Sequence, residues 1–332
     1  MTTYIIRRVL IMIPTLFLIS IISFTIIQLP PGDYLTTYIA NLAQTGETVD
    51  EARIESLRAR YGLDKPLHRQ YALWIWKILR HGDFGQSFSL NKPVKELIWE
   101  RLALTVAISV LAICVTWILA IPIGIYSATH QYKISDYIFT FFAFIGMATP
   151  GFLLALVVMN IAYTHFGISV GGLFSNEYID APWSWGKVVD LLQHVWIPVA
   201  VLAVAGTGGM VRTMRANLLD QLEMPYVVTA RAKGVSEWRL LLKYPVRIAV
   251  NPIVSTIGWM LPMLVSGSTI VAMVLSLPTT GPLLLNALME QDMYLAGSFI
   301  LMLSTLTVIG TLVSDLLLAW VDPRIRFGGQ AT

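Results

Sequence analysis

Long apolar runs alternate with polar segments along this chain. Six runs contain no Asp, Glu, Lys or Arg in their interiors and are long enough to cross a membrane, because a helix needs roughly 20 apolar residues to span the hydrocarbon layer. They lie at residues 9–29, within 102–129, within 137–165, and at about 191–211, 248–276 and 295–320. Several contain Pro and Gly, such as Pro122 and Pro150, which membrane helices tolerate because neighbouring groups satisfy the freed backbone. The pattern predicts an all-α chain with six transmembrane helices.

The first run and the polar segment after it divide the chain into three parts. Arg7 and Arg8 precede a run that is too long for a signal-peptide core and lacks a small-residue cleavage site, so we expect it to be retained. The expected parts are the first transmembrane helix with its N-terminus (1–32), a polar helical segment (33–101) and a five-helix core (102–332) that includes a polar loop (212–247).

The polar segment between the first two runs has the signals of two short helices. In DEARIESLRARYG, Asp50 is a candidate N-cap and Gly62 a stop. In DKPLHRQYALWIWKILRHG, Pro66 is at a first-turn position and Gly82 closes the helix. We expect amphipathic helices that either lie on the outer leaflet or pack against the transmembrane helices. Apolar residues at helical spacing form a stripe on the second helix: Leu67, Tyr71, Trp74, Ile75 and Ile78. The tryptophans suited to the headgroup level are Trp74, Trp76 and Trp99.

The composition supports a membrane protein. Hydrophobic residues make up 56% of the chain and charged residues 13%, with a mean hydropathy of +0.67, whereas soluble domains have about 25% charged residues. A net charge of +3 is too small to indicate nucleic-acid binding. The single cysteine, Cys114, lies in an apolar run, which excludes a disulfide framework and favours a core position.

The basic residues between the runs predict the orientation in the membrane. With the N-terminus inside, the short outer loops hold only Lys187, and the other basic residues gather on the cytoplasmic side, as in the positive-inside pattern. These are Arg7, Arg8, Lys133, the cluster within 212–247, Arg324 and Arg326. Residues 33–101 carry almost as many acids as cations, and segments of this length translocate largely regardless of charge. Both termini are therefore expected in the cytoplasm.

No acidic or basic side chain lies deep in a predicted span. An ion-coupled carrier normally needs such a group, because a charge at that depth is costly and is retained for function. Asp315 lies in the last two turns of the sixth run, and His165 and His194 lie near the outer surface without metal-ligand spacing. A membrane-embedded enzyme would need His, Asp or Cys residues that converge at one depth, and a nucleotide site would need a GxxxxGK[ST] loop. The sequence has neither, so any transport must draw its energy from another protein on the cytoplasmic side.

The sequence YVVTARAKGVSEWRLLLKYPVR, residues 226–247, has the form of a contact point for such a protein. Pro225 can start a helix that Gly234 ends, and Ser236 can cap a second helix that ends before Pro245. We expect a helix, a tight turn and another helix.

The first of these helices carries small residues at helical spacing. Val227, Ala230 and Gly234 would form a smooth face that a partner can approach closely, with Arg231 and Lys233 steering an acidic surface towards it. The alternative is that the cations only anchor the loop on the cytoplasmic side.

The same stretch resembles the cytoplasmic loop of ATP-binding-cassette importer permeases, in particular the dipeptide, oligopeptide and nickel group. Val228 replaces the Glu of the general signature, and Asn251-Pro252 stands where Leu-Pro is usual. The matching residues are Tyr226, Thr229, Ala230, Arg231, Ala232, Lys233 and Gly234.

The resemblance extends along the whole chain. YIIRRVLIMIPTLFLIS, PPGDY, YGLDKPLHRQY, HGDFGQS and VDPRIRF resemble family motifs in the same order. One expected outer loop differs from the family pattern. Residues 277–282 (LPTTGP) stand where the family usually has Pro-Gly-Leu-Gly, and QDMY stands where Arg-Asp-Tyr-Pro is common.

The resemblance implies a type I importer permease: a polytopic all-α protein with six transmembrane helices, an extracytoplasmic helical segment after the first and a coupling loop between the fourth and fifth. It implies a bacterial inner-membrane location in contact with lipid, a second homologous permease, two ATPase subunits and an extracytoplasmic solute-binding protein. ATP and Mg would be bound by the ATPases, and this chain would bind no cofactor or metal and catalyse no reaction. The solute would be a peptide or of similar size. An oligosaccharide is the alternative, and an ion-coupled carrier a more remote one.

Uncharged polar residues inside the spans are candidates for lining the translocation pathway. They could equally bond to neighbouring backbones and helices, as such groups commonly do. The candidates are Thr149, Asn160, Ser255, Ser266, Ser268 and Thr269.

Overall fold

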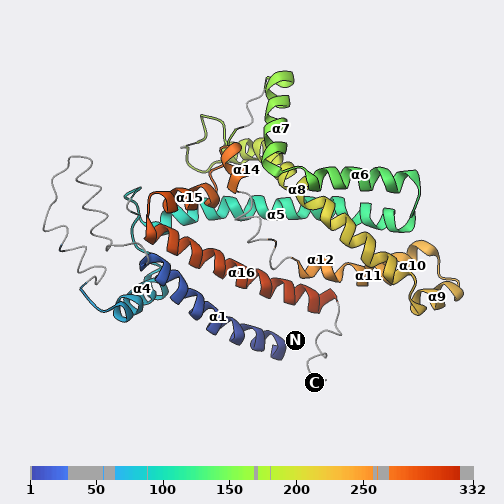
Figure 1. Cartoon of the computed structure of the whole chain (residues 1–332), viewed down its shortest axis with the longest axis horizontal. Coiled ribbons are helices and arrows are strands. Elements are labelled where there is room, and N and C mark those ends of the chain that lie inside the picture. The colour runs from blue at the N-terminus through green and yellow to red at the C-terminus, as the bar shows by residue number, and fades with distance from the viewer. Residues whose placement is uncertain are drawn as a thin grey trace. The chain divides into compact units, whose positions relative to one another are not determined.

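The computed structural model describes residues 2–28, 55, 64–87, 89–167, 171–179, 181–256, 260 and 269–321. Over these residues the chain is helical, apart from turns, loops and an isolated bridge between Gln86 and Pro93 (Figure 1). This confirms the all-α fold class. In chain order the helices are α1 (Thr2–Gln28), α4 (Leu67–His81), α5 (Val94–Thr129), α6 (Ile134–Ala148), α7 (Gly151–Phe166), α8 (Trp185–Leu222), α9 (Pro225–Ala232), α10 (Glu237–Lys243), α11 (Pro245–Ala249), α12 (Asn251–Ser255), α14 (Thr269–Val274), α15 (Thr280–Met289) and α16 (Met293–Val321).

Four of the described helices are long and apolar enough to cross a membrane, namely α1 (over Arg8–Gln28), α5, α8 and α16. They correspond to the first, second, fourth and sixth apolar runs. The third run forms α6 and α7, and counting this bent pair as one span gives up to five. Much of the fifth run, residues 257–259 and 261–268, lies outside the described residues. The expected number of six spans is therefore not confirmed.

The expectation of one continuous helix in the third run was wrong. α6 and α7 are bent by 101° at Thr149-Pro150. Proline lacks the N–H that the helix needs and pushes the preceding residue towards extended backbone, and Thr149 has φ −82° and ψ 121°. Pro14, Pro122 and Pro198 lie inside unbroken helices. Pro150 differs from them because Gly151, a weak helix former, follows it directly.

The chain forms two compact units, neither of which is continuous in sequence. The larger unit consists of Met1–Arg8, Leu104–Gly281 and Leu306–Thr332, and the smaller of Val9–Ala103 and Pro282–Thr305. The parts expected from the sequence, divided after residues 32 and 101, describe membrane topology and remain a prediction.

Helix α8 supplies residues to two hydrophobic clusters of the larger unit. In one cluster, Val201 packs with residues of α7 and α14 that include Ala155 and Val271. In the other, Met214 and Leu218 are fully buried among residues of α5, α10, α11 and α12. α8 is therefore the element around which the larger unit is packed.

Glycines allow α8 to lie close against its neighbours. A Cβ on Gly208 would overlap the backbone carbonyl oxygen of Ala143 on α6, and one on Gly124 of α5 would lie 2.6 Å from the Cβ of Met214. Such small-residue contacts are typical of membrane helices, whose association depends on close van der Waals packing.

In the smaller unit, α4 packs on the part of α1 that belongs to this unit. The ring of Tyr71 lies edge-on to Phe17 and Phe24, and its hydroxyl is 2.7 Å from the Ser20 hydroxyl. Trp74 is 6% exposed and contacts Phe24. Packing against a transmembrane helix is therefore confirmed for this segment.

Several details of the polar segment differ from the expectations. Trp74 is buried, while Trp76 and Trp99 are each 55% exposed, and the headgroup level expected for these tryptophans stays a prediction. Leu67 is 59% exposed and is not part of the packed stripe. Gly82 ends α4 as predicted, with a φ of +61°, whereas Pro66 is the N-cap residue just before the first turn. The other expected helix, around residues 50–62, lies outside the described residues apart from residue 55.

A buried carboxylate, Asp292, organises the turn before α16 in the smaller unit. One of its oxygens accepts hydrogen bonds from the Ser87 hydroxyl (2.5 Å) and from the backbone N–H and hydroxyl of Ser89 (3.3 and 3.1 Å). The other accepts the Leu295 N–H at 3.2 Å and so caps the start of α16. Gly85 lies against the ring of Tyr294, where a Cβ would come within 2.9 Å. The HGDFGQS and QDMY sequences are therefore structural partners.

Candidate functional site: the loop after α8

The loop that follows α8 has the predicted form of a helix, a tight turn and a helix. α9 begins at Pro225 and ends at Ala232, and Gly234 turns the chain with a φ of +73°. α10 begins at Glu237, and α11 follows directly at Pro245 (Figure 1). Ser236 occupies the N-cap position of α10, but its side chain makes no capping bond.

The small-residue face of α9 points into this loop. Val227 is 0% and Ala230 9% exposed, and both pack against the fully buried Leu240 of α10. Partly buried Tyr226, Val235 and Tyr244 surround them. The expectation that Val227 and Ala230 present a free face to a partner was wrong, because α10 of the same chain covers it.

Away from this buried cluster, α9, α10 and the turn between them expose apolar side chains and a cation. Val228 is 55%, Trp238 70% and Leu242 50% exposed. Ala232 and Lys233 are exposed as well. We call these five residues the exposed set. Large apolar side chains beside charges on an otherwise polar loop are typical of a surface that another protein covers.

Three of the residues that match the family signature bond within the loop or to the end of α8. The Arg231 guanidinium donates to both oxygens of Glu237, at 2.6 and 3.1 Å, and so bridges α9 and α10. The Glu237 hydrogen bond raises the pKa of Arg231, and the Arg231 hydrogen bond lowers the pKa of Glu237. The Tyr226 hydroxyl donates to Gln221 at 2.8 Å, and burial raises its pKa. The Thr229 hydroxyl donates to the Pro225 carbonyl at 2.8 Å.

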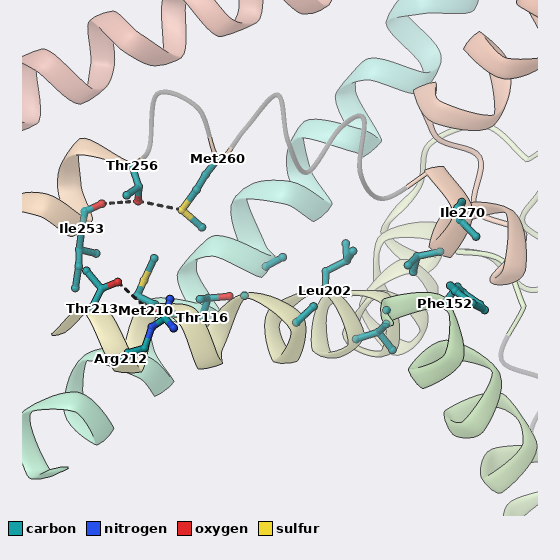
Figure 2. Close-up of a pocket in the computed structure, with 17 residues that line it drawn as sticks. Thr116, Phe152, Leu202, Met210, Arg212, Thr213, Ile253, Thr256, Met260 and Ile270 are labelled. Carbon is teal, nitrogen blue, oxygen red and sulfur yellow. Dashed lines mark hydrogen bonds between the residues drawn. The ribbon is translucent and has the colours of Figure 1, made fainter. Parts of the chain in front are cut away.

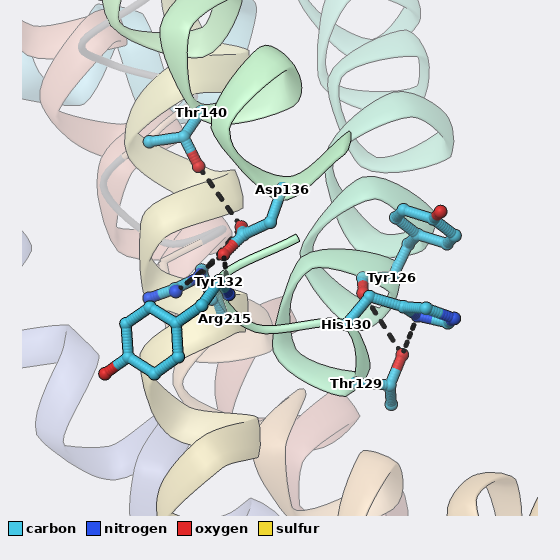
Figure 3. A network of polar contacts seen from close by, with 7 residues as sticks. All are labelled: Tyr126, Thr129, His130, Tyr132, Asp136, Thr140 and Arg215. Carbon is cyan, nitrogen blue, oxygen red and sulfur yellow. Dashed lines mark hydrogen bonds and ion pairs between the residues drawn. The ribbon is translucent and has the colours of Figure 1, made fainter. Parts of the chain in front are cut away.

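Just before the loop, an ion pair ties α8 to α6. Nε of Arg215 donates to Asp136 Oδ1 at 3.3 Å and Nη2 to Oδ2 at 3.0 Å. The Tyr132 N–H and the Thr140 hydroxyl also donate to this carboxylate (Figure 3). The Asp136 side chain is only 4% exposed. Sequence reasoning missed this pair, although an acid in the first turn of a helix was a visible signal.

A cavity of about 480 Å³ lies along α8 in the larger unit (Figure 2). Its walls come from α5, α7, α8, α12 and α14, and Met260 also lines it. They are mostly apolar, with Thr116, Thr213, Thr256 and Arg212 as the polar members.

None of the described pathway candidates lines this cavity. Thr149 and Ser255 donate to backbone carbonyls of their own helical segments, at 2.8 and 3.0 Å, and Asn160 is exposed. Thr269 begins α14, and Ser266 and Ser268 lie outside the described residues. Over the described ranges, no three His, Cys, Asp or Glu side chains gather as metal ligands.

Comparison with known proteins assigns the family. Residues 120–327 match the profile described as the binding-protein-dependent transport system inner membrane component, and residues 1–109 match the N-terminal profile of the same systems. The oligopeptide transport system permease protein AppB of Bacillus subtilis is 34% identical over 98% of this chain and 100% of its own length. A putative peptide permease of Brucella ovis is 31% identical over 98% of this chain and 99% of its own length. The oligopeptide transport system permease protein OppB of Haemophilus influenzae is 30% identical over 98% of this chain and 100% of its own length. The chain therefore belongs to the family of inner-membrane components of binding-protein-dependent transport systems.

Proposed function

We propose that this chain is a permease subunit of an ATP-driven peptide importer. The observation that carries the proposal is the similarity, over 98% of the chain, to permeases of oligopeptide transport systems. The helix-turn-helix loop beyond α8, with its exposed apolar residues, supports it from the structure.

In this proposal the chain is a multi-pass protein of the bacterial inner membrane, with both termini in the cytoplasm, and forms half of the pathway. A second, homologous permease supplies the other half. Two ATPase subunits, which bind ATP and Mg, contact the two cytoplasmic loops, and an extracytoplasmic binding protein delivers the peptide. This chain catalyses no reaction.

The packing of the larger unit suggests how motion would pass from the ATPase to the pathway. α9 and α10 share a buried cluster and the Arg231–Glu237 pair, so the loop moves as one body. α8 leads from this loop to the cavity without interruption, and Arg215 ties it to α6. ATP binding can shift the permease between conformations only through contacts that differ between them, and the exposed set would make those contacts.

The test uses the importer reconstituted in vesicles with its partner permease, ATPases and binding protein. Val228→Asp and Ala232→Asp place a carboxylate on exposed positions of α9 without touching its buried face. We expect ATPase co-purification and peptide-stimulated ATP hydrolysis to fall by roughly tenfold or more, because an unpaired buried charge at an interface costs several kcal/mol. Val228→Thr, similar in size and uncharged, is the matched control and should retain most activity.

The same vesicles distinguish the alternatives. Unchanged docking and uptake in both Asp variants would rule out the exposed set as the ATPase contact. Uptake of an oligosaccharide in place of peptides would move the assignment to a sugar importer. Uptake that persists without the ATPases would indicate an ion-coupled carrier.

A further inference from the structure

The cavity along α8 offers a bound solute one charged group. Its volume of about 480 Å³ lies within the range of about 300–1,000 Å³ that small-molecule sites occupy. Among the described residues that line it, Arg212 is the charged one and none is Asp or Glu. Figure 2 shows Arg212 at one end of the cavity, beside Thr213 and Met210, with Phe152 and Ile270 at the other end.

The hydroxyl groups in the lining already donate to the protein. Thr213 donates to the Gly209 carbonyl at 3.0 Å, Thr116 to the Ala203 carbonyl at 3.3 Å and Thr256 to the Ile253 carbonyl at 2.7 Å. They can accept hydrogen bonds from a solute but do not supply free donors. The Arg212 guanidinium, with five N–H donors, is thus the group able to bind an anion.

Arg212 also differs from arginines nearby in the larger unit. Arg8 pairs with Asp315 at 3.1 Å, Arg215 with Asp136 at 3.0 Å and Arg231 with Glu237 at 2.6 Å. Arg212, three residues before Arg215 on α8, has no ion pair with any residue that the structure describes.

We propose that the cavity receives the C-terminal end of a peptide in transit, with the peptide carboxylate bound by Arg212. This inference rests on the proposed importer function and adds the group that the pathway recognises. A guanidinium binds a carboxylate through two parallel hydrogen bonds, which gives the contact both strength and direction. The positive-inside orientation places Arg212 at the cytoplasmic end of the cavity, so the carboxylate end lies nearest the exit.

The remaining lining explains why other parts of the peptide would not be selected. Ala112, Ala205, Gly206 and Gly209 leave room along the wall, and Val201, Leu202 and Val271 make it apolar. Such a surface accepts side chains of many shapes, and the lining residues that the structure describes offer no carboxylate for the N-terminal ammonium. One terminal contact keeps binding weak enough for release, as a transport pathway requires. A neutral oligosaccharide has no carboxylate for Arg212 to pair with.

The experiment compares uptake of a tripeptide with a free C-terminus and of its C-terminal amide by the complete reconstituted importer. Arg212→Gln should reduce uptake of the free acid by about tenfold, the usual effect of losing a charged hydrogen-bonding partner, and leave uptake of the amide unchanged. Arg212→Lys should retain part of the preference for the free acid over the amide. The binding protein is the same in all samples. Its own preference for acid or amide therefore cancels when the uptake rate of each peptide by a variant is divided by the rate of wild type. Lys133→Gln, which removes an exposed cytoplasmic charge away from the cavity, is the control.

A second measurement does not depend on transport. Gly209 lines the cavity, and no atom lies within 4 Å of the position that a Cβ would take there, so Gly209→Cys introduces a thiol without a clash. In a Cys114→Ser background, the free-acid tripeptide should slow maleimide labelling of this thiol several-fold in the assembled importer. The amide should not slow the labelling. With Arg212→Gln, the free acid should no longer slow it either.

The outcomes separate the two proposals. If wild type imports neither peptide, the proposed function fails, while the labelling experiment still tests the cavity. If Arg212→Gln lowers uptake of acid and amide equally, Arg212 acts in folding or coupling and the inference is overturned. It is also overturned if the variant's effect appears only in vesicles that contain anionic lipid, because Arg212 would then bind a headgroup.

Discussion

Gly208 and Gly209 are neighbours on α8 with opposite surroundings. A Cβ on Gly208 would overlap the carbonyl oxygen of Ala143 and lie 3.0 Å from Met147, whereas Gly209 has nothing within 4 Å. A backbone carbonyl in a packed helix cannot move aside as a flexible side chain can. The contact between α6 and α8 therefore depends on one of these glycines and not on the other.

We predict that Gly208→Ala destabilises the protein by about 1–3 kcal/mol, the usual cost of overpacking, despite the better helix propensity of alanine. Gly209→Ala should be neutral or stabilising by up to about 1 kcal/mol. Thermal unfolding in detergent measures the stability change of each variant. Each variant is the control for the other, because the two substitutions are chemically identical. Equal stability of the two variants would contradict the close approach of α6 and α8.

The Asp136–Arg215 pair is the second residue-scale feature. Asp136→Asn keeps the shape but leaves Arg215, whose side chain is 28% exposed, without its counter-charge. We predict a loss of about 2–3 kcal/mol, less than for a fully buried pair because water reaches the guanidinium. Asp220→Asn, an exposed acid on the same helix, should change stability by less than about 0.5 kcal/mol.

A double-variant cycle separates the pair from its members. Asp136→Leu with Arg215→Met should recover much of the stability lost in either single variant, because no buried charge remains unpaired. Additive losses would show that the two residues act independently and that α6 and α8 are not tied at this point.

At the scale of elements, the loop after α8 shows which features a sequence can predict. Pro225 and Gly234 act through their own backbones, so the start of α9 and the turn were correctly predicted. The prediction that Val227 and Ala230 form a free face was wrong. Helical spacing identifies residues that share a face, but it does not say which neighbour covers that face, and Leu240 of α10 does so.

The bend between α6 and α7 was missed for a related reason. Hydropathy is continuous across residues 137–165, and a proline by itself does not decide between a kinked span and a break. In the structure, Pro150 followed by Gly151 removes both a hydrogen bond and helix propensity at one point. Similarly, the bonds from Ser87 and Ser89 to Asp292 join residues about two hundred positions apart, which no local pattern reveals.

The Arg231–Glu237 pair links α9 to α10 and predicts a pH dependence. The hydrogen bond from Arg231 lowers the pKa of Glu237 below the ordinary 4.5. The stability that the pair adds to the loop is therefore fully present above that value and is lost as pH falls through the lowered pKa. Hydrogen exchange of the amides in residues 233–237, corrected for intrinsic rates, should show protection that declines below about pH 4.5 and at high salt. Glu237→Gln should remove this dependence, and a wild-type loop with pH-independent protection would contradict the link.

At the scale of the whole molecule, the predicted orientation can be tested directly. In the Cys114→Ser background, cysteines replace Lys65 and Glu177, expected outside, or Lys133 and Ser236, expected inside; all four positions are exposed. A membrane-impermeant thiol reagent applied to intact spheroplasts should label the first two and not the others, which react after lysis. Labelling of position 236 from outside would contradict the cytoplasmic placement of the loop.

α8 holds 38 residues and is therefore about 57 Å long, whereas the hydrocarbon layer is about 30 Å thick. If residues 191–211 fill that layer, the part from Arg212 to Leu222 extends about 16 Å beyond it. The loop then stands clear of the lipid headgroups at a height set by this helix. If an ATPase docks on this loop as proposed, membrane thickness becomes a variable of coupling, because a thicker bilayer would draw α8 inward and bring Trp238 and the docked ATPase towards the headgroups.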